Sequence, residues 1–196
     1  MEIFLNLTSI LFTFFFNFQV DNIDRIGVKG PLTFNKCKFI ISWTKIVNET
    51  YYIQEYLPKG EKIENFSEML TVHLFTKDSS VNNAVAIKIN ELDLRKKFDN
   101  ICNYQISNSP DSKEWIVDFI ISESKNNVIN IVEFNIYRYK QIELNNSKAL
   151  LVFSYTKRTY GKNINNFLNE LSKIRIALLN SMIKFTIPKI ILRKIK

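Results

Sequence analysis

The side chains best suited to acid–base chemistry are four glutamates that lie close together in the sequence. They are Glu55, Glu61, Glu64 and Glu68. Two carboxylates can divide the acid and base roles when their surroundings drive their pKa values apart. Spacing alone does not provide such surroundings, and a solvated face is the simpler interpretation. A carboxylate-dependent hydrolase is therefore only an alternative, and we name no catalytic residue.

The other residues that could do chemistry are the single histidine and two cysteines. His73 lies in a pattern typical of a strand, where a lone histidine is more often structural than a base. The sequence has no Gly-x-Ser-x-Gly elbow and no Gly-rich phosphate loop. One histidine and two cysteines do not close a zinc site without carboxylates, so we expect no metal and no cofactor. Cys37 and Cys102 either form a disulfide, worth about 4 kcal/mol in an oxidising compartment, or remain free thiols.

The most distinctive segment, residues 55–69, reads EYLPKGEKIENFSEM and joins two predicted strands. It combines a rigid turn with charged and aromatic side chains, and loops on a rigid scaffold often carry function. The pattern Glu-Tyr-x-Pro-x-Gly-Glu followed by Asn-aromatic-x-x-Met resembles a segment of small secreted bacterial proteins of unknown function. Those proteins also have an aromatic-Arg-aromatic stretch before the last helix, to which Arg158, Tyr160 and Arg175 would correspond.

Eight residues are the candidate binding residues: Glu55, Tyr56, Lys59, Glu61, Asn65, Phe66, Arg158 and Tyr160. The resemblance implies no activity for them. The alternative is a structural connection in which Glu61 pairs with Arg158 or caps a turn.

The N-terminus predicts export. Residues 3–18 are apolar, about the length of a signal-peptide core, and a polar stretch follows. Glu2 replaces the expected positive charge and no small-x-small cleavage site precedes Asp21, so an uncleaved anchor and a buried element stay open. We divide the chain into a signal peptide or anchor (1–20), one domain (21–187) and a basic C-terminal tail (188–196).

The charge and composition limit the partners. The chain has 196 residues, a net charge of +8 and a hydrophobic fraction of 46%, which is enough for a packed core. The positive charge is spread over most of the chain, and the tail is the one dense basic stretch. The tail could lie on an anionic membrane surface. Tyr137, Arg138 and Tyr139 mix residues that stack on bases and bind phosphates, but strand alternation puts Arg138 on the opposite face. We do not expect nucleic acid as a partner.

Hydrophobic periodicity predicts an α+β fold. Strand patterns cover residues 39–46, 49–56, 69–75, 101–106, 115–122, 128–140 and 149–160, and helix patterns cover 79–98 and 161–187. The apolar faces expected for the helices are Ala84, Ile87, Leu94 and Phe98 in the first, and Ile164, Phe167, Leu168, Leu171, Ile174, Leu178 and Met182 in the second. Short turns imply an antiparallel sheet of about six or seven strands packed with two main helices. This element order resembles the sandwich of PsbP-like proteins over residues 30–185.

These patterns favour a non-enzymatic binding or accessory module, secreted or periplasmic, that takes an unknown protein or small ligand in the envelope. The expected binding surface is one sheet edge together with the 55–69 segment. The first alternative is a membrane-surface protein, held by the N-terminal segment and the basic tail.

Overall fold

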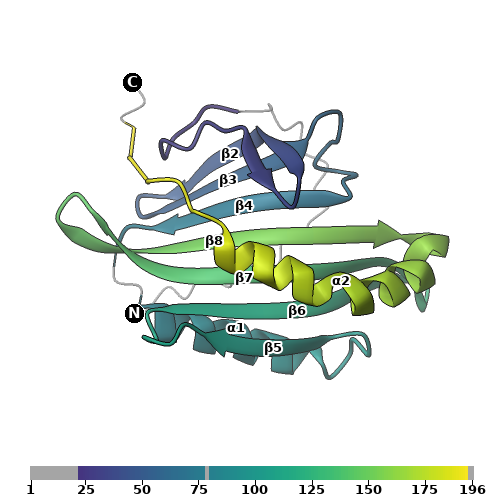
Figure 1. Ribbon diagram of the computed structural model, residues 1–196. Coiled ribbons are helices and arrows are strands. Elements are labelled where there is room, and N and C mark those ends of the chain that lie inside the picture. The colour runs from purple at the N-terminus through teal and green to yellow at the C-terminus, as the bar shows by residue number, and fades with distance from the viewer. Residues whose placement is uncertain (1–21, 78–79, 194–196) are drawn as a thin grey trace.

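One antiparallel sheet of eight strands forms the body of the protein (Figure 1). The computed structural model describes residues 22–77 and 80–193, so the predicted signal or anchor at residues 1–20 lies outside the described residues. The strands are β1 (Leu32–Phe34), β2 (Cys37–Asn48), β3 (Tyr51–Pro58), β4 (Glu68–Phe75), β5 (Asn103–Asn108), β6 (Glu114–Lys125), β7 (Val128–Leu144) and β8 (Ser147–Tyr160). They lie in the order β1-β2-β3-β4-β8-β7-β6-β5.

Asparagine pairs make the tightest connections. Asn126 and Asn127, which join β6 to β7, both have positive φ, as do Asn145 and Asn146, which join β7 to β8. A two-residue hairpin turn with positive φ at both positions matches the twist of the flanking strands, and asparagine tolerates that conformation. Both hairpins can therefore extend into long strands.

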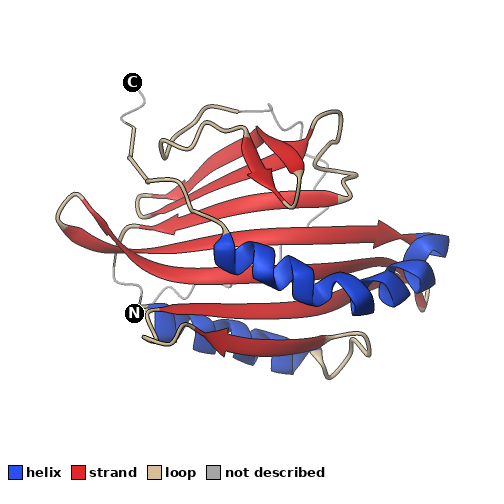
Figure 2. Ribbon diagram, in the orientation of Figure 1, coloured by secondary structure: helices blue, strands red, loops and turns tan. Residues whose placement is uncertain are grey.

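The two helices lie on opposite faces of the sheet. Helix α2 (Ile164–Lys184), which follows the short turn η1 (Gly161–Asn163), crosses in front of the sheet, while α1 (Val81–Arg95) lies behind β5 and β6 (Figure 1). Most of the remaining ribbon is strand (Figure 2). We call the two sides the α2 face and the α1 face.

The α2 face holds the larger hydrophobic core. Leu70, Val72 and Leu74 of β4 project into it, and Phe153 of β8 stacks on Phe185 with ring centroids 4.6 Å apart. The predicted stripe of α2 is confirmed, because all seven residues pack against this core. The sequence periodicity succeeds here because one face of the helix is apolar along its whole length.

The phase of α1 is different from the predicted one. Ser80 caps the helix by accepting a hydrogen bond from the Asn83 amide at 3.2 Å. Leu94 and Phe98 are exposed, whereas Lys88 is 1% exposed. Ala84 is buried as expected, but the expectation for Leu94 and Phe98 was wrong, because a hydrophobic pattern cannot find a face that contains a buried lysine.

The predicted sheet of about six or seven strands packed with two main helices is also wrong. The protein is mostly sheet, curled into a half-barrel of eight strands to which the helices are added. The sequence pattern missed β1, which is only three residues long. Register shifts interrupt the ladders between Ile41 and Trp43 and between Glu123 and Ser124. Such bulges bend and twist a sheet, which favours curling over a flat layer.

The predicted tail is a docked strap as far as Arg193. Ile190 is buried in the α2-face core, and the Ile191 amide donates to the Ile26 carbonyl at 2.9 Å. Arg193 pairs with Asp24 at 3.3 Å. Gly27 permits this approach, since a Cβ at its position would lie 3.0 Å from the Cβ of Ile191.

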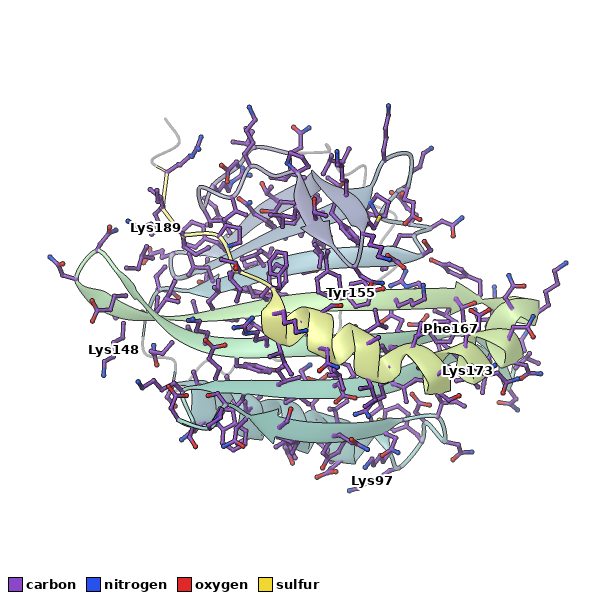
Figure 3. All side chains as sticks on the ribbon, in the orientation of Figure 1. Lys97, Lys148, Tyr155, Phe167, Lys173 and Lys189 are labelled. Atoms are coloured by element: carbon purple, nitrogen blue, oxygen red, sulfur yellow. The ribbon has the colours of Figure 1, made fainter. Side chains whose placement is uncertain are left out.

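Lys97, Lys148, Lys173 and Lys189 lie far apart at the periphery (Figure 3), so the positive charge is distributed.

Candidate functional site

A row of polar side chains crosses the α1 face beside the helix. Strand register places Glu55 opposite Thr71, Thr71 opposite Ser154, and Ser154 opposite Tyr137, from β3 to β7. In the next row, the Thr156 hydroxyl donates to the Asn135 Oδ1 at 2.7 Å. We call these two rows the polar face.

Glu55 is the most unusual group of the polar face. Its side chain is partly buried, and burial raises its pKa to about 7 although nearby Arg158 opposes the shift. Within the described part of the chain, no hydrogen bond to its carboxylate is formed. The Asn135 Nδ2, in a side chain only 3% exposed, also has no hydrogen-bond partner. Buried polar groups usually have partners, so these two groups are available to a ligand.

Arg158 is already committed to a neighbouring carboxylate. Its guanidinium forms an ion pair with Glu133, which is 5% exposed, and the two residues lie opposite one another on β8 and β7. It also lies over the Phe66 ring, 3.9 Å from the ring centroid. Arg158 therefore joins the polar face to the 55–69 segment.

Phe66 anchors the loop between β3 and β4. Its ring packs with Leu57 and Met69 in a small separate core. The Phe66 amide donates to the Tyr160 hydroxyl at 3.2 Å, and that hydroxyl donates to the Phe66 carbonyl at 3.1 Å. Three contacts on one residue fix the loop on the sheet, which is the rigid scaffold that a recognition loop needs.

Glu61 holds the loop together instead of pointing outward to a partner. Its carboxylate accepts hydrogen bonds from the Ser67 amide at 2.9 Å and from the Ser67 hydroxyl at 2.5 Å. This matches the alternative in which Glu61 caps a turn. Lys59 and Asn65 are exposed at the tip of the loop.

The remaining predicted binding residue lies elsewhere. Tyr56 is fully buried on the α2 face, where its hydroxyl donates to the Val28 carbonyl at 2.5 Å. The structure therefore brings together Glu55, Phe66, Arg158 and Tyr160, leaves Lys59 and Asn65 at the tip, and separates Tyr56 from them.

Two further groups on this face, His73 and Lys88, carry shifted pKa values. Burial and nearby Lys88 lower the pKa of His73 to about 3, so His73 is neutral at pH 7, and its Nδ1 lies 2.9 Å from the Tyr51 hydroxyl. Lys88 pairs with Glu91 at 2.7 Å and lies over the Tyr137 ring at 5.2 Å. Burial lowers the pKa of Lys88 as well. A histidine with so low a pKa is a poor general base.

The four clustered glutamates do not converge. Glu55 lies on the α1 face, Glu61 binds Ser67, Glu64 is exposed, and Glu68 pairs with Lys157 at 2.8 Å. In residues 22–77 and 80–193, no group of three metal-binding side chains is close enough to hold an ion. The arrangement of these four side chains offers hydrogen bonding and ion pairing.

Both cysteines are free thiols in the structure, and no disulfide joins Cys37 to Cys102. Cys37 packs against the α2-face core and Cys102 is buried in the α1-face core. Burial raises the pKa of both thiols, which makes them poor nucleophiles.

A cavity of about 220 Å³ lies away from the polar face, at the β5–β6 hairpin beside the end of α2. Arg138 lines it together with Pro110, Ile116 and Ile183. The Arg138 guanidinium donates to the carbonyls of Met182 and Phe185, both at 2.9 Å, and pairs with Glu114. These bonds satisfy carbonyls at the helix terminus, so Arg138 has a structural role there.

A protein-family profile matches residues 26–187, and the function of that family is unknown. No curated protein and no solved structure matches the chain. No helix in the described ranges is long and apolar enough to cross a membrane.

Proposed function

This chain belongs to that family of unknown function, and we propose that it is a non-enzymatic binding module that acts outside the cytoplasm. Its ligand or partner binds the polar face around Glu55, beside the loop that Phe66 anchors. The apolar residues 3–18 and the resemblance of the 55–69 segment to small secreted bacterial proteins support export.

One observation carries the proposed site. The Glu55 carboxylate is partly buried and receives no hydrogen bond from the described residues, while Arg158 beside it is held by Glu133. Leaving a buried polar group without a partner costs about 1–3 kcal/mol. Asn135 Nδ2 is such a group, so a ligand that accepts from it recovers that cost, and Glu55 offers an acceptor in the neighbouring row.

The same geometry weakens the two alternatives. A carboxylate-dependent hydrolase needs two carboxylates beside one bond, but Glu55 has Arg158 as its charged neighbour and Glu133 is neutralised by the same arginine. For a membrane-surface protein held by its tail, one cation of the described tail is already engaged, because Arg193 pairs with Asp24 at 3.3 Å.

The test is a thermal-shift screen of the full chain against a library of small polar compounds and short peptides. We expect the compounds that raise Tm of the wild type to lose their effect in Glu55→Gln. Glu143→Gln is the matched control, because Glu143 is an exposed glutamate on β7. A set of binders that acts equally on Glu55→Gln would refute the site.

The enzymatic alternative has a separate test. A panel of chromogenic ester, glycoside and phosphate substrates is incubated with the wild type and with Glu55→Gln. Turnover by the wild type that disappears in Glu55→Gln would overturn the non-enzymatic assignment while retaining the site.

Export has its own test. The intact mass and the cell fraction of the protein from its host are measured, and a full-length chain in the cytosol would contradict export.

A further inference from the structure

The side of α2 that faces away from the sheet carries isoleucines among polar residues and lysines. Its exposed residues recur at helical spacing, and they include Lys173, Ile176, Asn180, Ile183 and Lys184. Ile176 is 60% exposed and Ile183 is 56% exposed. The opposite side of the helix already supplies the apolar stripe that packs on the sheet, so the packing of the fold does not account for these two isoleucines.

The strap continues this surface beyond the helix. Both α2 and the strap lie in front of the sheet (Figure 1), and Lys173 and Lys189 belong to these two elements (Figure 3). Ile190 is buried, whereas Ile191 is 55% exposed, so the strap also turns an isoleucine outward beside the exposed Lys189. We call these exposed residues the lysine–isoleucine surface: Lys173, Ile176, Ile183, Lys184, Lys189 and Ile191.

The lysine–isoleucine surface carries charge of one sign. Residues 171–196 contain lysine and arginine but no aspartate or glutamate. The same is true of residues 25–48, which begin with the segment that pairs with the strap. Within the described ranges, the three lysines of the surface form no ion pair. The surface therefore offers uncompensated positive charge to a partner.

The acidic groups packed against these elements do not cancel that charge, because each already has a cation of its own. These pairs are Asp118 with Arg175, Glu114 with Arg138, and Asp24 with Arg193. Glu170, the one acidic residue of α2, precedes the surface by a turn of the helix. Charge complementarity therefore favours an anionic occupant.

We propose that the lysine–isoleucine surface docks on an anionic phospholipid bilayer, with α2 lying parallel to the membrane. Isoleucine side chains enter the boundary between headgroups and acyl chains, and the lysines around them contact the phosphates. Ile176 and Ile183 are about two turns apart on one side of the helix, so both reach the bilayer in this orientation. A nucleic acid fits less well, since no aromatic side chain is exposed in residues 164–193 to stack on bases.

This contact is separate from the proposed ligand site. The polar face lies on the opposite side of the sheet from α2, so docking leaves it open to its ligand. The contact needs neither residues 1–20 nor Arg193, and it therefore differs from an attachment through the N-terminal segment and the tail.

Co-sedimentation of the full chain with lipid vesicles tests the docking. We expect binding to vesicles that contain phosphatidylglycerol and little binding to phosphatidylcholine alone. About 0.5 M NaCl should release the protein, because the screening length is then only about 4 Å.

A charge variant tests the lysines. Each lysine beside an anionic surface contributes about fivefold in affinity, so Lys173→Gln, Lys189→Gln should weaken binding about twentyfold. The matched control is Lys97→Gln, Lys148→Gln, which removes the same charge from positions far from the surface (Figure 3). The control should bind within about twofold of the wild type.

An apolar variant tests the isoleucines without changing the charge. Ile176→Gln, Ile183→Gln should weaken binding at least about tenfold. Its control is Leu94→Gln, Phe98→Gln, because these two apolar side chains are exposed on the α1 side of the sheet. Every substituted position is exposed, so circular dichroism and Tm should match those of the wild type.

Four outcomes would overturn the proposal. A wild type that binds neither kind of vesicle, or both equally, would do so. Binding that survives in the charge and apolar variants would show that another segment holds the chain. A wild type that binds heparin but no vesicle would show that the surface takes a different polyanion. None of these outcomes bears on the ligand test, which depends on Glu55→Gln.

Discussion

The two faces of the sheet differ in the elements that cover them and in the polar groups that they contain. On the α2 face, α2 and the strap at residues 185–193 cover a continuous apolar core, and the charge that enters it is paired: Asp118 bonds to Arg175 at 2.6 Å. On the α1 face, the short helix α1 covers the β6 and β7 side, and the neighbouring surface is polar. There Glu55 and the Asn135 amide lack partners among the described residues.

This difference indicates that the α2 face mainly stabilises the fold, and it makes the polar face the proposed binding surface. Apolar burial provides most of the free energy of folding, and the α2 face supplies the greater part of it. Buried polar groups without partners reduce stability, so the polar face costs free energy that the α2 face offsets. Perturbed ionisable groups gather at functional sites, which is why the polar face, and not the larger core, is the proposed binding surface.

The largest expected effect tests the role of the α2 face. Phe153→Ala removes a fully buried ring that stacks on Phe185, and it should lower the free energy of unfolding by about 4 kcal/mol. Ser154→Ala, the next residue on β8 but on the polar face, should cost less than about 1 kcal/mol. Urea denaturation measures both. Similar losses in the two variants would remove the distinction between the faces.

A smaller effect tests the ion pair of the polar face. Arg158→Met leaves Glu133 buried without its partner, and we expect a loss of about 3 kcal/mol. The double variant Arg158→Met, Glu133→Leu should recover most of that loss, because an apolar pair replaces the buried charges. If the double variant were no more stable than the single one, the charge of Glu133 would not be the cause.

The pH dependence tests Glu55. Its pKa in the folded state is about 7, above its ordinary value of 4.5, so the folded state favours the protonated form. This contribution is complete below pH 4.5 and is lost as the pH rises through 7. The stability of the wild type relative to that of Glu55→Gln should therefore fall by an amount on the order of 2 kcal/mol between about pH 5 and about pH 8.

Glu143→Gln should show the same fall relative to Glu55→Gln as the wild type does. Urea midpoints at the two pH values measure it. His73 acts in the opposite direction within the lower part of this window, because its stabilising contribution is lost as the pH falls below 6.5 toward its folded pKa of about 3. The comparison with Glu55→Gln cancels this contribution, since His73 is present in both proteins. An equal decline in Glu55→Gln would show that another group titrates.

The smallest effect concerns the loop beside the polar face. Glu61→Ala removes both hydrogen bonds to Ser67 and should cost about 1 kcal/mol. Lys59→Ala and Asn65→Ala, at the exposed tip, should stay within about 0.5 kcal/mol of the wild type. Hydrogen exchange of the Phe66 amide should increase only in Glu61→Ala. An unchanged rate would mean that Tyr160 alone holds the loop.

The sequence predicts those parts of the fold that depend on local periodicity. The stripe of α2 and the shared face of Leu70, Val72 and Leu74 follow from spacing alone. The face of α1 does not, because Lys88 is buried against the Phe119 and Tyr137 rings and its pattern reads as polar. The curl of the sheet depends on bulges, which leave no clear mark in the sequence.

The residues of the candidate site also divide into those that the sequence identifies and those that it does not. The distinctive 55–69 segment identifies Glu55, Phe66 and Glu61, although Glu61 proves to be internal to the loop. Asn135 and Glu133 were missed, because only the pairing of β7 with β8 places them beside Thr156 and Arg158. The alternation of polar residues within the apolar run VEFNIY was the available signal, since it marks one face of β7 as polar.

The pairing of β4 with β8 also governs when the sheet can be completed. β4 ends at Phe75, whereas its neighbour β8 begins at Ser147, after α1, β5, β6 and β7 have been made. The hairpins on either side of this junction form from local contacts, but joining them requires closing a long loop, which slows folding. During synthesis from the N-terminus, the β1–β4 half exposes the open edge of β4 until the last strand emerges. This interval is when a chaperone would protect the chain most.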